Sequence, residues 1–243
     1  MDTLAISQSE GESALGCTPD KLCVEIAPSQ SGCEGQACAT DAAGGTDLSL
    51  QLPGRQGDPA HTPYRIAGLP SADASIQLWP KLIRFEGGVL VGVQTQERNM
   101  YSGGGASATT LHLIAFVPGQ APFEVLSAPQ SSSATIRACF SERDMKQRAG
   151  ACHDEYSFDA SLALTSTSAA GWPVLRYRSK ATSFPGRVSR SKDSLAARPL
   201  RQRDLVTVAD PQCSYQRLYR FAPQARTYVP DIPAPDCADY TVP

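Results

Sequence analysis

Eight cysteines in a chain of 243 residues constrain this protein more than any other feature of its sequence. An even number of cysteines at short separations is typical of a disulfide framework formed in an oxidising compartment. We expect one bridge between Cys139 and Cys152, one between Cys213 and Cys237, and two among the first four cysteines, which are Cys17, Cys23, Cys33 and Cys38. A four-cysteine zinc site is the alternative for that first group, but its spacing lacks the paired short separations of such sites. We therefore expect no metal and no cofactor.

The cysteines also predict where the protein resides. The opening segment, 1–16, contains neither a positively charged stretch nor an apolar core, so it does not form a signal peptide. The expectation is a secreted or periplasmic protein whose targeting segment has been removed, with an outer-membrane lipid anchor as an option. No apolar run approaches the length that a membrane-spanning helix needs, so the sequence predicts no transmembrane segment.

Charge divides the chain unevenly, although the formal net charge is only −2. Residues 1–60 carry 9 acids and 2 bases, a net charge of −7, whereas residues 176–226 carry 3 acids and 12 bases, a net charge of +9. The first segment is also poor in aromatic residues. We expect residues 1–60 to be a polar, cysteine-rich extension, and residues 61–243 to be the main domain. Because bases do not exceed acids overall and the compartment is oxidising, no nucleic acid is expected as a partner.

Short segments rich in β-branched and aromatic residues predict strands throughout the main domain. The clearest runs from Tyr156 to Leu164, where apolar and polar residues alternate with the period of a half-buried strand. The predicted strands are 74–85, 88–96, 109–117, 123–127, 134–140, 155–165, 172–181, 204–208 and 215–221. A single helix is expected at 141–149, capped by Ser141. This pattern predicts an all-β fold, an antiparallel barrel, a sandwich or a propeller-like sheet of about 8–10 short strands.

A glycine-rich stretch at 99–107 is predicted to be a long loop between two strong strands. It is no phosphate cradle, because a strand follows it where such a loop needs a helix. Its centre is Tyr101, Ser102, Gly103 and Gly104, which we predict to be the partner-binding residues. Tyrosine offers a flat, amphipathic contact surface at low entropic cost. A flexible hairpin connection without a partner is the open alternative.

A basic segment at 176–203 provides a second candidate surface. Arg176, Arg178 and Lys180 alternate with other residues, so a strand would present the three cations on one face. They could bind an anionic glycan or another anionic surface of the cell envelope. The open alternative is a solvated basic segment that balances the acidic segment 1–60.

Motifs for catalysis are weak in this sequence. The remaining enzyme hypothesis is an envelope hydrolase that uses His153 with Asp154 or Glu155, or paired carboxylates such as Glu86 and Glu97. Nothing in their spacing requires this, and we expect a protein that is not an enzyme.

The segment around the glycine-rich stretch resembles the periplasmic lysozyme inhibitors and the related immunity lipoproteins of antibacterial secretion systems. The similarity is confined to a short part of the chain: a V-x-V strand at 89–93, the Ser-Gly stretch at 101–105 and an L-x-x-F strand at 113–116. It implies that Ser102 and Gly103 enter the cleft of a peptidoglycan hydrolase and contact its catalytic carboxylates, with Tyr101 beside them. In the family the tyrosine follows the Ser-Gly pair, whereas here Tyr101 precedes it. The resemblance thus implies a non-catalytic inhibitor or immunity protein.

Overall fold

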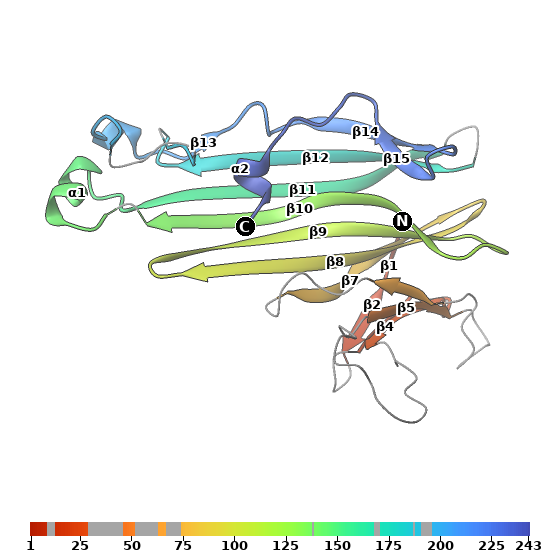
Figure 1. The fold of residues 1–243 in the computed structure, drawn as a ribbon. Coiled ribbons are helices and arrows are strands. Elements are labelled where there is room, and N and C mark those ends of the chain that lie inside the picture. The colour runs from red at the N-terminus through yellow and green to blue at the C-terminus, as the bar shows by residue number, and fades with distance from the viewer. Residues whose placement is uncertain are drawn as a thin grey trace.

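The computed structural model describes residues 1–8, 13–28, 46–51, 63–66, 74–137, 139–167, 171–186, 188–190 and 196–243. The all-β prediction is confirmed, since two antiparallel sheets account for nearly all of the regular structure (Figure 1). One sheet has ten strands and forms the long axis of the molecule, and the other has five and packs below one end of it.

The large sheet is mainly a meander, in which consecutive strands pair side by side. Its order is β1-β7-β8-β9-β10-β11-β12-β14-β15, with β13 paired to β12 outside this path. The strands are β1 (Asp2–Thr3), β7 (Ser75–Phe85), β8 (Gly88–Tyr101), β9 (Gly104–Phe116), β10 (Phe123–Arg137), β11 (His153–Thr167), β12 (Pro173–Phe184), β13 (Val208–Ala209), β14 (Gln216–Ala222) and β15 (Thr227–Pro230). The sheet is open, because β15 and the β1–β7 side are its two edges.

Several predicted boundaries are wrong, and the strands are longer than predicted. The stretch at 99–107 is not a long loop: β8 and β9 pair through Tyr101 and Gly104, and only Ser102 and Gly103 form the turn. The predicted strand 123–127 and residues 134–137 of the predicted strand 134–140 belong to the single strand β10, which ends at Arg137 and passes a bulge between Pro129 and Ser131. Of the segment predicted as a strand at 204–208, Asp204 ends the short helix η1 (Gln202–Asp204) and only Val208 is a strand residue, the first of β13.

One face of the large sheet, called the inner face below, carries the main core. Strand β12 shows the alternation that produces it, with Leu175, Tyr177 and Ser179 buried and the residues between them exposed. The C-terminal segment covers this face: Cys213, Tyr228 and Cys237 pack into the same core, and α2 (Ala238–Thr241) lies over β10 and β11 (Figure 1). Residues distant in the sequence thus shield the apolar side of the meander from water.

The small sheet packs on the opposite, outer face over β7–β9. Its order is β2-β3-β4-β5-β6, with β2 (Ala5–Gln8), β3 (Ala14–Cys17), β4 (Cys23–Pro28), β5 (Thr46–Gln51) and β6 (Tyr64–Ile66). Val24, Leu48 and Leu50 share a second core with side chains of β7–β9 such as Leu82 and Ile114. The described parts of residues 1–60 therefore form a packed layer on the main sheet and share a core with it.

Three disulfides lie among the described cysteines. They join Cys17 to Cys23, Cys139 to Cys152, and Cys213 to Cys237. The two later bridges are those predicted, and the first is one of the pairings left open. Cys33 and Cys38 lie outside the described residues.

Candidate functional site

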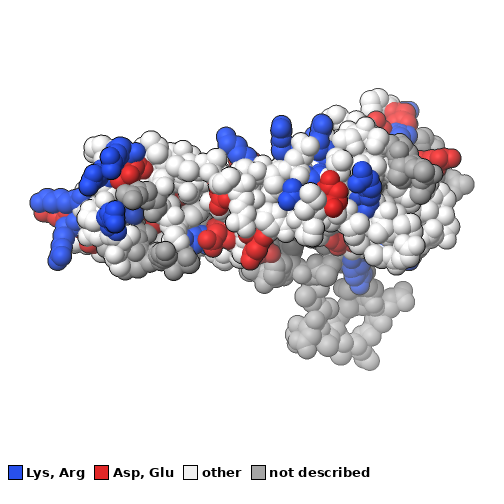
Figure 2. All heavy atoms as spheres, turned by 90° about the horizontal axis from the view of Figure 1, so that it is seen from above, with Lys and Arg blue, Asp and Glu red and all other residues white. Residues whose placement is uncertain are grey.

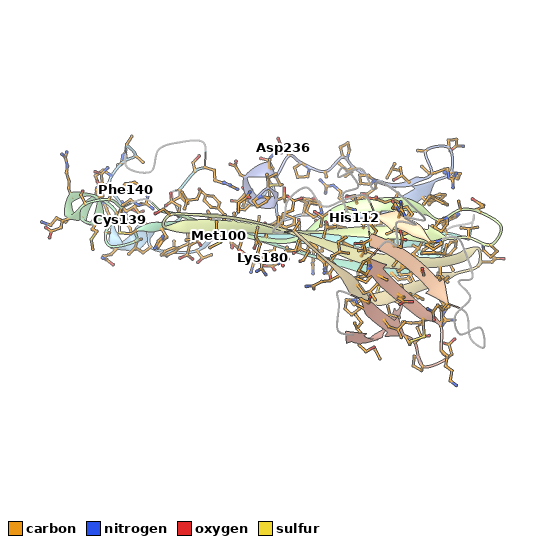
Figure 3. All side chains as sticks on the ribbon, turned by 60° about the horizontal axis from the view of Figure 1, so that its bottom comes forward. Met100, His112, Cys139, Phe140, Lys180 and Asp236 are labelled. Carbon is orange, nitrogen blue, oxygen red and sulfur yellow. A yellow bond between two sulfur atoms is a disulfide. The ribbon has the colours of Figure 1, made fainter. Side chains whose placement is uncertain are left out.

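At the far end of the large sheet, one segment lies beside the β8–β9 turn and a second segment docks on the first, and we call this region the distal tip. It consists of residues 102–103, 139–153 and 196–204. Figure 3 shows Cys139 and Phe140 at this end of the molecule, away from the small sheet. Within the tip, the turn residue Gly103 lines an open pocket of about 580 Å³ together with Cys139, Phe140, Ser141, Met145, Cys152 and His153. The predicted binding residues therefore lie beside a loop that the sequence did not connect with them.

Local signals in the sequence form the tip loop between β10 and β11. Helix α1 (Glu142–Gln147) begins after Ser141, whose hydroxyl accepts a hydrogen bond from the Asp144 backbone N–H at 3.2 Å. The Asp144 carboxylate in turn accepts one from the Phe140 N–H at 3.1 Å. Hydrogen bonding of the Asp144 carboxylate with the Ser141 side chain, and then with the Phe140 N–H, holds the pKa of Asp144 below its usual value. Such reciprocal capping satisfies backbone donors that a helix start leaves free, so the predicted helix and its cap are confirmed.

A buried ion pair holds the loop from inside. The Arg148 guanidinium donates a hydrogen bond to the Asp154 carboxylate, and their side chains are only 3% and 2% exposed. Arg148 also donates from Nε to the Ala151 carbonyl oxygen at 3.2 Å. Because the Cys139–Cys152 disulfide closes the same loop, the tip has a covalent and an electrostatic support within the single stretch 139–154. Its surface is consequently presented on a fixed frame.

The tip surface combines exposed apolar side chains with cations. Phe140 is 72% exposed and Met145 is 50% exposed, which is unusual for large apolar side chains at neighbouring positions. Segment 196–204 docks on α1 through a backbone hydrogen bond of 2.9 Å from Leu200 to Gln147. Segment 196–204 thereby adds its exposed cations to the exposed cations of α1. The cations of the two segments are Arg143, Lys146, Arg198, Arg201 and Arg203, and their acids are Glu142, Asp144 and Asp204. Lys and Arg side chains gather at this end in Figure 2.

His153 lines the tip pocket, but its proposed carboxylate partners do not join it there. Asp154 points into the buried ion pair with Arg148, and no carboxylate lines the pocket among the described residues. Glu86 and Glu97 lie near opposite ends of β8, roughly 35 Å apart along an extended strand. The described residues also contain no group of three or more His, Cys, Asp or Glu side chains that could hold a metal ion. Within the described residues, Asp154 thus lies away from the His153 pocket, and Glu86 lies far from Glu97.

The basic row lies elsewhere, on the outer face of β12. Arg176, Arg178 and Lys180 are all exposed there, between buried neighbours. Figure 3 places Lys180 on the opposite side of the sheet from Asp236, which belongs to the segment that covers the inner face. The basic row and the distal tip are thus separate surfaces.

Sequence reasoning missed a polar relay that crosses three strands. The Thr95 hydroxyl lies 3.0 Å from His112 Nε2, and His112 Nδ1 lies 3.1 Å from a Glu124 carboxylate oxygen. Burial raises the pKa of the Tyr64 hydroxyl, and the hydrogen-bonded Glu124 carboxylate raises it further, which ties the relay to the small sheet. The order hydroxyl, imidazole, carboxylate is that of a nucleophile triad. Acyl transfer also needs free N–H groups that bind an oxyanion. Thr95 and His112 lie in central strands, each of which pairs through its backbone with a strand on both sides. The relay links β8, β9 and β10 through their side chains.

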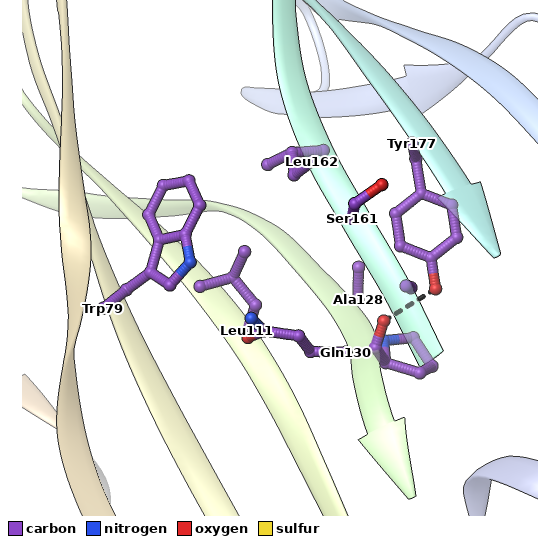
Figure 4. Close-up of a pocket in the computed structure, with 9 residues that line it drawn as sticks. Trp79, Leu111, Ala128, Gln130, Ser161, Leu162 and Tyr177 are labelled. Atoms are coloured by element: carbon purple, nitrogen blue, oxygen red, sulfur yellow. Dashed lines mark hydrogen bonds between the residues drawn. The ribbon is translucent and has the colours of Figure 1, made fainter. Parts of the chain in front are cut away.

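An inner pocket is too small to bind a ligand. It lies on the inner face between Trp79, Leu111 and Tyr177, whose hydroxyl donates a hydrogen bond of 2.6 Å to the Pro129 carbonyl oxygen (Figure 4). Its volume is about 10 Å³, which holds one water molecule at most. The distal tip and the basic row are therefore the stronger candidate sites.

Comparisons with known proteins add no relative to this description. No protein-family model matches the chain, no curated protein matches it, and no solved structure matches it. In the described part of the chain, none of the helices has the length and hydrophobicity that a membrane crossing requires.

Proposed function

We propose that this protein is a non-catalytic protein binder that contacts its partner through the distal tip. The observation that carries the proposal is the exposure of Phe140 and Met145 beside the β8–β9 turn. Exposed apolar side chains rimmed by polar residues mark interaction sites, and aromatic anchors contribute most of the binding energy at interfaces. The disulfide and the buried ion pair favour such a role, because a rigid surface loses little conformational entropy when it binds.

The most specific partner for this surface is a peptidoglycan hydrolase of the lysozyme kind. Glycoside hydrolases act through a pair of carboxylates in their cleft, and the tip carries five exposed cations against three acids. A narrow two-residue turn at Ser102 and Gly103 is also easier to insert in a cleft than a broad loop. With Tyr101 and Gly104 on either side, this turn would enter the cleft, as in the inhibitors that the sequence resembles. The three disulfides favour a periplasmic or otherwise oxidising location.

The test adds the full chain or one of its variants to a lysozyme and measures how strongly each inhibits the degradation of peptidoglycan. Phe140→Ala with Met145→Ala should weaken inhibition about thirtyfold, the effect of losing about 2 kcal/mol of binding energy. Tyr101→Ala with Ser102→Ala should weaken it as well, with an unchanged melting temperature in both cases.

A matched control removes apolar side chains elsewhere. Ile6 and Ile232 are 40% and 58% exposed and lie outside the tip. Ile6→Ala with Ile232→Ala should therefore leave inhibition unchanged. Equal inhibition by the tip variants and by this control would refute the assignment of the tip, and absence of inhibition by the wild-type chain would refute the hydrolase partner.

A further inference from the structure

The outer face of β12 carries a row of cations that the proposed function does not use. Arg176, Arg178 and Lys180 project from alternate positions of one strand, so neighbouring charges are about 7 Å apart along it. Arg220 is exposed on the same side of the adjacent strand β14, because its neighbour Tyr219 packs into the inner core. Figure 2 shows Lys and Arg side chains projecting in a row from one long side of the molecule.

These cations have no carboxylate partner within the described structure. The ion pairs found there involve Arg65, Arg84, His112 and Arg148, and none involves the β12 row. Asp159 faces Lys180 across the β11–β12 ladder without forming an ion pair with it. Unpaired charges on a rigid surface repel one another, and a bound anion relieves that repulsion. The row thus differs from the internally balanced charges around Arg84.

The strand beneath the row is fixed in place. Tyr177 and Ser179 project to the inner face, where their hydroxyls donate hydrogen bonds to the carbonyl oxygens of Pro129 at 2.6 Å and Cys213 at 2.8 Å. Strand β12 also pairs with β11 on one side and with β14 on the other. The spacing of the cations is therefore set by the sheet, and a ligand meets it already formed.

The register neighbours of the row include no aromatic side chain. Arg178 lies between Ser161 and Gln216 in register, and Arg176 lies between Ala163 and Leu218. Such neighbours offer hydroxyl and amide groups for sugar hydroxyls but no aromatic face. Binding of single-stranded nucleic acid relies on base stacking on aromatic side chains, so the surface favours a polysaccharide. Among the described residues, the small sheet packs on this face over β7–β9 and not over β12 or β14.

We infer that the outer face of β12 and β14 binds a linear acidic polysaccharide, with its negative charges aligned along Arg176, Arg178 and Lys180. The site is independent of the distal tip. A polymer that lies along the strand engages several cations at once, and each added contact strengthens binding through charge.

The experiment measures binding of the full chain to polygalacturonate, dextran sulfate and neutral dextran at about 50 mM and about 300 mM salt. The wild-type protein should bind both acidic polymers but not neutral dextran, and the higher salt should weaken binding. Arg176→Gln with Arg178→Gln and Lys180→Gln should weaken binding about tenfold, because it removes three weak contacts that act together.

The matched control removes the same charge from elsewhere. Lys21, Lys81 and Arg98 are exposed cations outside the row, so their combined change to Gln should weaken binding less than about twofold. An equal loss in both triple variants would overturn the site, since general charge would then explain the binding. Tighter binding to a single-stranded oligonucleotide than to either acidic polymer would overturn the ligand class, and no binding to either polymer would overturn the inference as a whole.

Discussion

Removing one partner of the buried Arg148–Asp154 pair is expected to destabilise the distal tip strongly. In Asp154→Asn the guanidinium of Arg148 stays buried, at 3% exposure, without its counter-charge. Loss of one partner from a buried pair costs about 3–5 kcal/mol, because the desolvation of the remaining charge is no longer offset. For a chain of this size, about 1 kcal/mol corresponds to about 2–4 °C, so the melting temperature should fall by about 6–20 °C.

An exposed pair within the same protein provides the control. Arg65 and Asp47 lie 3.4 Å apart on the small sheet, with side chains that are 65% and 26% exposed. Asp47→Asn should cost less than about 1 kcal/mol, as surface ion pairs do. The double change of Arg148→Met with Asp154→Leu should recover most of the loss, because it leaves no buried charge.

Chemical denaturation monitored by circular dichroism provides the free energies, and hydrogen exchange at 142–147 reports whether the tip opens before the rest. If Asp154→Asn costs no more than Asp47→Asn, and α1 exchanges as in the wild-type protein, the pair does not hold the tip. The reasoning about its burial would then be wrong.

Two further predictions concern the inner core, one for a substitution and one for the effect of pH. Gly92→Ala places a Cβ 2.6 Å from Trp79 Cε3, so the Trp79 ring must move. Such overpacking costs about 1–3 kcal/mol of stability and should lower the melting temperature by several degrees. An unchanged melting temperature would show that the Trp79 ring moves freely. Burial raises the pKa of Tyr177 and Tyr228 above the ordinary value of 10. The stability contributed by these neutral hydroxyls is fully present below pH 10 and is lost as the pH rises towards the raised pKa values. Tyrosine absorbance should therefore show late ionisation that coincides with alkaline unfolding, and ordinary titration in the folded protein would contradict the burial.

Local patterns in the sequence predicted much of the large sheet, and contacts between distant segments explain what they missed. The alternation from Tyr156 to Leu164 predicted β11, and the capping residue Ser141 predicted the start of α1. The sequence predicts a loop around Ser102 and Gly103, because three consecutive glycines are typical of loops. The tight turn becomes evident only when β8 and β9 are placed in register. The relay at His112 depends on register across three strands, which no local pattern contains. The tip pocket likewise joins Gly103 with side chains of the distant segment 139–153.

Proline residues at its edges limit the ability of the large sheet to pair with a further strand. A sheet ends in strands whose free N–H and C=O groups can pair with another molecule. On one side, Pro80 lies at a bulge in β7 and has no N–H, and its carbonyl oxygen accepts a hydrogen bond from the Leu4 N–H. Strand β1 pairs with Lys81 and Leu82, which follow Pro80. On the other side β15 has four residues and ends at Pro230. Both margins are thus poor templates for a further strand, which protects so long a sheet from edge-to-edge aggregation.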